Sequence, residues 1–196
     1  MILVVAAMKE EIKEIIKYPH QNVRFLVTGV GKVNAAMKLT EVIQHEQITS
    51  IYNFGFAGAT SAYQVGDMVV IEDAIYHDFD LTMFDYQKGQ VPGYPPKFQS
   101  DDELVRQASM ISNTKKGHLF TGDVFFTKPT TEEMIVDMEG AALYQVAHTY
   151  HIPIISIKVV SDIIGMDQHI ENYKRFEAEQ GAQALCAIYK KVIKGE

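Results

Sequence analysis

The chain has 196 residues, of which 47% are apolar and 22% charged, and its net charge is -7 at pH 7. These values fit one globular domain, residues 1–196, with a substantial core. The acidic balance argues against nucleic-acid or membrane partners, which need basic faces. The single cysteine, Cys186, cannot form an internal disulfide and lies among apolar residues. We expect it to be buried, in a protein of the reducing cytoplasm.

Apolar, β-branched runs alternate with helical patterns along the chain. Strands are predicted over 2–7, 23–28, 51–54, 67–74, 118–121, 134–137 and 153–160, and residues 75–80 could extend the sheet. Helices are predicted over 9–17, from about 33, over 101–112 with Asp101 as N-cap, over 139–149, and from about 172. Alternation of this kind indicates an α/β domain.

Two segments lead to further expectations. Val33, Ala36, Met37, Val42 and Ile43 share one stripe at helical spacing, which predicts a buried helix face. Residues 83–100 are rich in glycine and proline and predict a long loop, and loops of this length are usually functional.

Three carboxylates follow predicted strands, namely Glu11, Glu139 and Asp162. In an open α/β sheet, ligands bind at the carboxyl edge of the strands. Glu10 and Glu11 are adjacent, so at most one of them is expected to face that edge. Asp162 follows a strongly apolar run, and burial there would raise its pKa and suit it to proton donation. The pattern indicates an enzyme that acts on a small organic substrate.

Two other motifs favour plainer interpretations. Gly29-Val30-Gly31-Lys32 lacks the hydroxyl residue of a phosphate loop, so a tight turn from strand to helix is preferred. His77-Asp78-Phe79-Asp80 has metal-ligand spacing, but no second cluster accompanies it, and a polar strand end is the preferred interpretation.

Motifs along nearly the whole chain resemble one family, the 5′-methylthioadenosine/S-adenosylhomocysteine nucleosidases of the nucleoside phosphorylase superfamily. They are Ala7–Glu11, Thr28–Ala36, Asn53–Gly58, Val65–Asp67, Tyr76–Phe84, Gly89–Gly93, Gly122–Phe125, Met138–Glu139 and Ser161–Asp162. The resemblance implies a three-layer α/β/α fold with a central mixed, twisted β-sheet.

The resemblance also implies hydrolysis of the bond between adenine and ribose through an oxocarbenium-like transition state. Asp162, with Ser161 beside it, matches the general acid that protonates the purine. Glu11 matches the residue that activates the attacking water. Glu139 matches the carboxylate that binds the ribose hydroxyls, and Met138 is expected to pack against the sugar.

Other matched positions complete the implied site. Phe125 is expected to stack on adenine, and the Phe126 backbone to contact the base edge. The remaining substrate positions are Met8, Val30 and Tyr173 around the 5′-thioether, and Ala57 and Gly58 where the backbone approaches the ligand. A neighbouring subunit is expected to contribute Leu81, Phe84 and Pro92, so the resemblance implies a homodimer. It implies no metal and no organic cofactor.

The chain departs from the family pattern in two shortened segments, between Glu11 and Gly29 and between Phe126 and Met138. Phe56 stands where a serine is usual, and Lys158 where an arginine is usual, both near the expected water. Three alternatives therefore stay open: a purine nucleoside phosphorylase, a futalosine-type hydrolase, and a catalytically weak nucleoside-binding relative.

Overall fold

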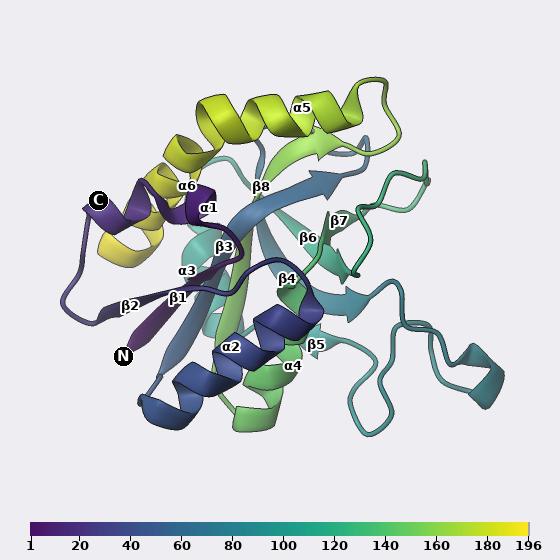
Figure 1. Cartoon of the computed structure of the whole chain (residues 1–196), viewed down its shortest axis with the longest axis horizontal. Helices are drawn as coiled ribbons and strands as arrows, with labels where there is room; N and C mark the ends of the chain where they lie inside the picture. Colours follow the sequence, from purple (N-terminus) through teal and green to yellow (C-terminus); the bar gives the residue numbers. More distant parts are fainter. Residues whose placement is uncertain (196) are drawn as a thin grey trace.

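A computed structural model describes residues 1–195 and shows a mixed β-sheet between two layers of helices (Figure 1). The strands are β1 (Ile2–Ala6), β2 (Val23–Val27), β3 (Ser50–Ala59), β4 (Met68–Tyr76), β5 (Phe98–Gln99), β6 (Thr114–Thr121), β7 (Ile135–Asp137) and β8 (Ile154–Ile163). The α-helices are α1 (Lys9–Ile12), α2 (Lys32–His45), α3 (Asp102–Ser109), α4 (Gly140–Tyr150), α5 (His169–Phe176) and α6 (Ala182–Tyr189). Short 3-10 turns are η1 (Ile15–Lys17) and η2 (Thr82–Phe84), and π-helical turns are η3 (Glu177–Gly181) and η4 (Lys190–Lys194).

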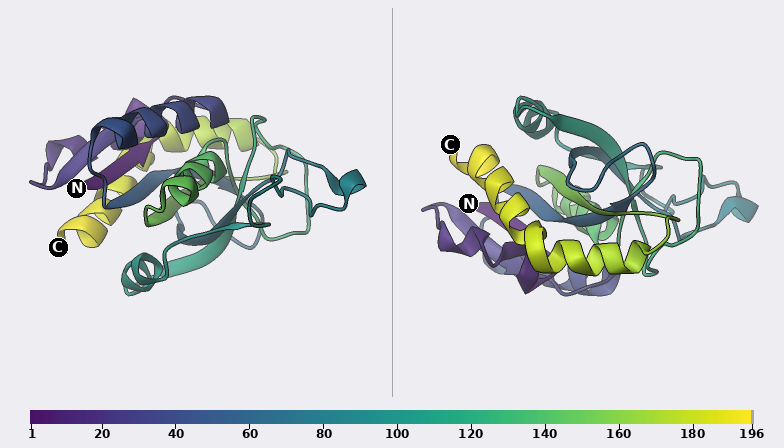
Figure 2. Two further views of the ribbon diagram at one scale, coloured as in Figure 1. Left: turned by 90° about the horizontal axis from the view of Figure 1, so that it is seen from below. Right: turned by 90° about the horizontal axis from the view of Figure 1, so that it is seen from above.

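Two apolar cores lie on the two faces of the sheet. The first joins the sheet to α2 and α4, and the second joins it to α1, α5 and α6. Figure 2 shows α5 and α6 crossing the sheet in the view from above. Because both faces are covered, β1, β3 and β8 are buried along almost their whole length. The expected three-layer α/β/α fold is confirmed.

The strand pairing closes part of the sheet on itself. β8 pairs in parallel with β3 and antiparallel with β4, while β7 pairs antiparallel with β3 and in parallel with β6. Since β4 also pairs with β6, these five strands form a ring. At the end of β3, Gly58 lies between Val136 of β7 and Asp162 of β8.

A bulge interrupts the pairing of β3 with β8. Ala57 pairs with Val160, but the next residue, Gly58, pairs with Asp162, so Ser161 is the extra residue. Val159 packs in the core under α5 and Val160 in the core under α4. A Cβ on Gly58 would lie 3.0 Å from Asp162 Oδ2, on the α5 face. The bulge therefore directs Asp162 to the α5 face of the sheet.

Several local predictions are confirmed. Asp101 caps α3, because its side chain accepts hydrogen bonds from the backbone N–H groups of Glu103 and Leu104. Cys186 is buried. Gly29 and Gly31 form the predicted turn, with φ angles of 83° and 98° that glycine adopts without strain.

Other predictions are wrong. Strand β8 extends to Ile163, so Asp162 lies inside the strand and not beyond its end. Strand β3 likewise continues through Gly55–Gly58. On α2 the side chains of Val33 and Met37 are 75% and 54% exposed, while Ala35, Leu39 and Val42 are buried. The apolar stripe of α2 thus extends onto a face that the described chain leaves uncovered.

The segment between β4 and β5 remains largely irregular, as predicted. It carries η2 and projects from the body of the molecule in every view (Figures 1 and 2). Within residues 1–195, no helix has the length and apolar character needed to cross a bilayer.

Candidate active site

A cavity opens at the carboxyl ends of β1, β3 and β7 and beside the last residues of β8. Its volume is about 100 Å³. The residues that line it are Ala7, Met8, Glu11, Val30, Phe56, Ala57, Gly58, Val124, Phe125, Phe126, Val136, Asp137, Met138, Glu139, Ser161, Asp162, Ile164, His169 and Tyr173.

Beyond the end of β1, the Glu11 side chain forms the next hydrogen bond to β3 and lines the cavity. Its Oε1 accepts the backbone N–H of Phe56, and its Oε2 accepts those of Ala7 and Met8, all at 2.9 Å. Burial raises the pKa of Glu11, although nearby Lys158 and these three hydrogen bonds lower it. Its neighbour Glu10 is exposed, as expected of adjacent residues. The result is a carboxyl group that three backbone hydrogen bonds hold in place and whose pKa lies above its ordinary value.

Lys158 is a buried cation among carboxylates. Its Nζ lies 2.9 Å from Asp137 Oδ2, and its side chain is only 3% exposed. Burial by itself lowers the pKa of Lys158, but Asp137, Glu11 and Glu139 raise it to a net increase. Its charge is thus already balanced by the protein.

Glu139 lies at the N-terminus of α4, next to this cluster. Its Oε1 accepts the Gly31 backbone N–H at 2.8 Å. Burial and the charge of Asp137 raise the pKa of Glu139 to about 7. This carboxyl group can therefore accept or donate hydrogen bonds at neutral pH.

Asp162 also lines the cavity, beside Gly58 of β3, and is 1% exposed. The Ser161 hydroxyl donates to its Oδ1 at 2.5 Å, and its Oδ2 lies 2.6 Å from His169 Nε2. Burial raises the pKa of Asp162, while Ser161 and His169 lower it by less. The net effect favours the protonated acid, which can donate a proton to a ligand.

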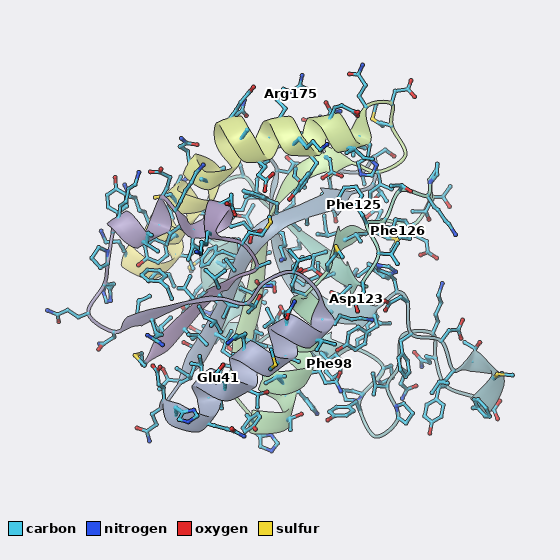
Figure 3. All side chains as sticks on the ribbon, viewed as in Figure 1. Glu41, Phe98, Asp123, Phe125, Phe126 and Arg175 are labelled. Carbon is cyan, nitrogen blue, oxygen red and sulfur yellow. The ribbon has the colours of Figure 1, made fainter. Side chains whose placement is uncertain are left out.

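Aromatic rings surround this acid. Phe125 stacks on His169 with ring centroids 5.2 Å apart and planes at 28°, and it meets Tyr173 edge-on at 5.8 Å. Figure 3 labels Phe125 and Phe126 beside the loop that precedes α5. The Tyr173 hydroxyl in turn lies 4.0 Å from the Met8 sulfur. A flat ring and a thioether would both find apolar contacts here.

The structure brings together the twelve residues predicted for one subunit's site. They are Asp162, Glu11, Glu139, Met138, Phe125, Phe126, Ser161, Met8, Val30, Ala57, Gly58 and Tyr173. The three residues predicted to act across a subunit interface, Leu81, Phe84 and Pro92, lie outside the cavity wall. Phe84 is 63% exposed.

Sequence reasoning missed two polar residues of the cavity. Asp137 is the last residue of β7 and of the predicted strand 134–137. Its place at the carboxyl edge of the sheet was a usable signal. His169 gave no signal, because a lone histidine before a helix has no spacing to interpret.

Comparisons with known proteins agree with this geometry. Residues 14–194 match the family model described as the phosphorylase superfamily. The chain is 38% identical over 185 residues to the 5′-methylthioadenosine/S-adenosylhomocysteine nucleosidase of Bacillus cytotoxicus, covering 86% of this chain and 79% of that protein. The crystal structure of a putative 5′-methylthioadenosine/S-adenosylhomocysteine nucleosidase from Borrelia burgdorferi, bound to adenine, superposes with a TM-score of 0.90. The two sequences are 31% identical, and the match covers the full length of both chains. The Streptococcus pyogenes S-adenosylhomocysteine nucleosidase, in complex with 5-methylthiotubericidin, gives a TM-score of 0.88 at 28% identity, covering 99% of this chain and 96% of that one.

Proposed function

The chain belongs to the phosphorylase superfamily and, within it, to the 5′-methylthioadenosine/S-adenosylhomocysteine nucleosidases, and we propose that it hydrolyses the N-glycosidic bond of these two nucleosides. The products are adenine and a 5-thio-substituted ribose. The observation that carries the proposal is the buried Asp162, whose pKa is raised, beside the Phe125 ring in a cavity that also holds Glu11 and Glu139.

Asp162 acts as the general acid. As the glycosidic bond breaks, negative charge develops on the purine, and a proton donated to its imidazole nitrogen neutralises it. The Ser161 hydroxyl engages Oδ1, and the ligand meets Oδ2, which lies 2.6 Å from His169 Nε2 in the ligand-free chain. General-acid catalysis of this kind contributes roughly 10²- to 10⁴-fold.

Glu11 orients and deprotonates the water that attacks the anomeric carbon. Its three backbone hydrogen bonds fix the carboxylate in place before the substrate arrives. Glu139 accepts hydrogen bonds from the ribose hydroxyls, and Met138 packs against the sugar. On the purine side, Phe125 stacks on the base and the Phe126 backbone contacts its edge.

The 5′-thio group enters the apolar end of the cavity. Met8, Val30 and Tyr173 line this end, and the 4.0 Å contact between Tyr173 and the Met8 sulfur supports a site that suits a thioether. Ala57 and Gly58 form the cavity wall at the end of β3, where Gly58 presents no side chain to the ligand.

Hydrolysis is favoured over phosphorolysis because the two lysines that could bind phosphate are already paired with carboxylates. A phosphate ion needs an uncompensated cation near the anomeric carbon. Lys158 is paired with Asp137, and Lys32 Nζ lies 2.7 Å from the Asp78 carboxylate. Neither cation is left to hold an anion.

The test is to incubate the pure protein with methylthioadenosine, adenosylhomocysteine and futalosine-type nucleosides, with and without phosphate, and to measure the released base. We expect free adenine from the first two substrates at rates independent of phosphate. Phosphate-dependent release would indicate a phosphorylase, and tight binding without release would indicate a nucleoside-binding relative.

The working unit is a homodimer of this domain, residues 1–196, in the cytoplasm. Leu81, Phe84 and Pro92 reach the 5′ end of the partner's cavity. Support comes from the projecting segment around η2, where Met83 is 84% exposed, and from the uncovered Val33 and Met37 of α2. Apolar surface of this kind is costly unless a partner covers it.

Mixed dimers test the shared site. Asp162→Asn removes the acid of its own cavity, and Phe84→Asp damages the partner's cavity. If Phe84 acts across the interface, a hybrid dimer contains one cavity with both defects and one with neither. We expect two weakly active preparations to regain activity when mixed, toward a quarter of the wild-type value at equal amounts. Light scattering that shows a monomer, or mixing without recovery, would contradict the shared site.

A further inference from the structure

His169, the first residue of α5, is turned into the protein while its neighbours face solvent. Residues 165–168, Ile170 and Glu171 are all exposed, whereas His169 is 6% exposed. The segment before it contains two left-handed residues, Gly165 and Gln168, with φ angles of 78° and 61°. The exposed and tightly turned segment 165–171 therefore contains one buried polar side chain, the His169 imidazole.

The two polar atoms that meet here are poorly satisfied. His169 Nε2 lies 2.6 Å from Asp162 Oδ2. Within residues 1–195, however, neither atom makes an aligned hydrogen bond, although both are buried. Buried polar atoms without aligned partners cost free energy, and a ligand that replaces one of them can recover it.

The cavity is also small for a ligand site. Sites for small molecules commonly measure roughly 300–1,000 Å³, and this cavity measures about 100 Å³. The His169 ring lines it and lies flat against Phe125 at 5.2 Å. The His169 ring thus takes up space in the part of the cavity where the purine is expected.

We propose that the imidazole of His169 occupies the purine subsite in the ligand-free protein and is displaced by the nucleoside. This inference rests on the proposed function, which assigns the same two contacts to adenine: a stack on Phe125 and a nitrogen facing Asp162. The imidazole is the five-membered half of a purine, so the side chain reproduces both contacts. It keeps a partner beside the buried Asp162 when no ligand is bound, and it lowers ligand affinity by competition.

The consequence for the reaction lies in binding and release. A protein whose open form is only partly populated binds its ligand more weakly by that fraction. After the bond is cleaved, the return of His169 to Phe125 favours departure of adenine. His169 is thus a determinant of affinity.

The experiment compares His169→Ala with the control Glu171→Ala, which alters an exposed residue of the same helix. We expect the dissociation constant of adenine, measured by calorimetry, to fall about fivefold or more in His169→Ala, with the KM of the nucleoside falling in parallel, and to stay at the wild-type value in Glu171→Ala. Added imidazole should restore the competition in His169→Ala and leave Glu171→Ala unaffected at the same concentration. Unchanged or weaker adenine binding in His169→Ala would overturn the proposal.

A second measurement uses the wild-type chain and does not depend on how the variant folds. A crystal structure with adenine should show the base on Phe125 and the His169 ring outside the cavity. His169 still stacked on Phe125 would refute displacement. Adenine binding is measured without turnover, so the two proposals fail separately. A wild-type protein that releases no adenine from any nucleoside refutes the function, whereas a working wild type with an unaltered His169→Ala affinity refutes only the role of His169.

Discussion

Glu11, Glu139 and Asp162 are carboxyl groups of one cavity, yet their neighbours differ. Glu11 accepts three backbone N–H groups, Glu139 lies beside the charge of Asp137, and Asp162 meets a hydroxyl and an imidazole. Burial raises the pKa of all three. The neighbours then decide which group can hold a proton for the base and which can take one from water.

Replacing the acid tests this division at the residue scale. We expect Asp162→Asn to lower kcat by roughly 10²- to 10⁴-fold. Unfolding stability should not fall, because burial already favours the neutral form of this side chain. The matched control is Asp167→Asn, an exposed acid of the following segment. Near-normal turnover in Asp162→Asn, measured as adenine release, would remove the residue from the acid role.

Replacing Lys158 tests whether its cation balances the buried carboxylates. We expect Lys158→Met to destabilise the protein by about 3–5 kcal/mol, because it leaves the buried Asp137, Glu11 and Glu139 without their cation. Lys115→Met breaks a 2.6 Å pair with Asp67 at the surface and should cost less than about 1 kcal/mol. Urea unfolding measures both, and equal losses would contradict the assigned role of Lys158.

At the scale of elements, the helical layer α5, η3 and α6 packs against the sheet because a large side chain of the sheet faces a glycine of that layer. Phe56 projects from β3 and meets Phe176 of α5 edge-on, with ring centroids 5.6 Å apart. Gly181, the last residue of η3, leaves room for the Phe56 ring, since a Cβ there would overlap it. The phenylalanine that replaces the expected serine is therefore accommodated by a glycine more than a hundred residues away.

This fit predicts that one substitution changes the unfolding stability in opposite directions in two backgrounds. We expect Gly181→Ala to destabilise the wild-type protein by about 1–3 kcal/mol through overpacking. In a Phe56→Ser background, the same change should stabilise by up to about 1 kcal/mol, because alanine favours helical backbone. A double-mutant cycle of urea unfolding measures the coupling. Effects of the same sign in both backgrounds would show that the two residues do not share this space.

For the whole molecule, buried carboxyl groups make stability depend on pH. The pKa of Glu139 rises from 4.5 to about 7 on folding, so the folded state binds its proton more tightly than the unfolded state. Its contribution is complete below about pH 4.5 and is lost as the pH rises through about 7. Glu11 and Asp162 shift in the same direction.

The measurement is the difference in unfolding free energy between the wild-type protein and Glu139→Gln, without ligand, from pH 4 to 8. We expect this difference to fall by up to about 3 kcal/mol over that range. Subtraction removes the other titrating groups, such as Asp78, whose pKa is lowered. A flat difference, or one that rises with pH, would contradict the buried state of Glu139.

Much of this arrangement could be predicted because it follows from strand order. The carboxyl-edge rule located Glu11, Glu139 and Asp162 from short motifs. Packing decided the rest. The stripe on α2 predicted an apolar face but could not tell that Val33 and Met37 lack cover from their own chain. The bulge at Ser161 and the inward turn of His169 depend on contacts between distant segments, and no local spacing encodes them.

The bulge at Ser161 also determines where the scissile bond must lie. With a regular ladder, Ser161 would oppose Gly58, and Asp162 would point toward α4, on the side where Lys158 approaches Gly55. The extra residue instead turns Asp162 to the α5 face beside Gly58, two residues further along β3 than Phe56, whose N–H Glu11 accepts. The scissile bond of a bound nucleoside must then lie between these two positions, with the base on the Asp162 side and the sugar on the Glu11 side. We therefore expect a compound that reaches both carboxyl groups to bind more tightly than one that reaches Asp162 alone.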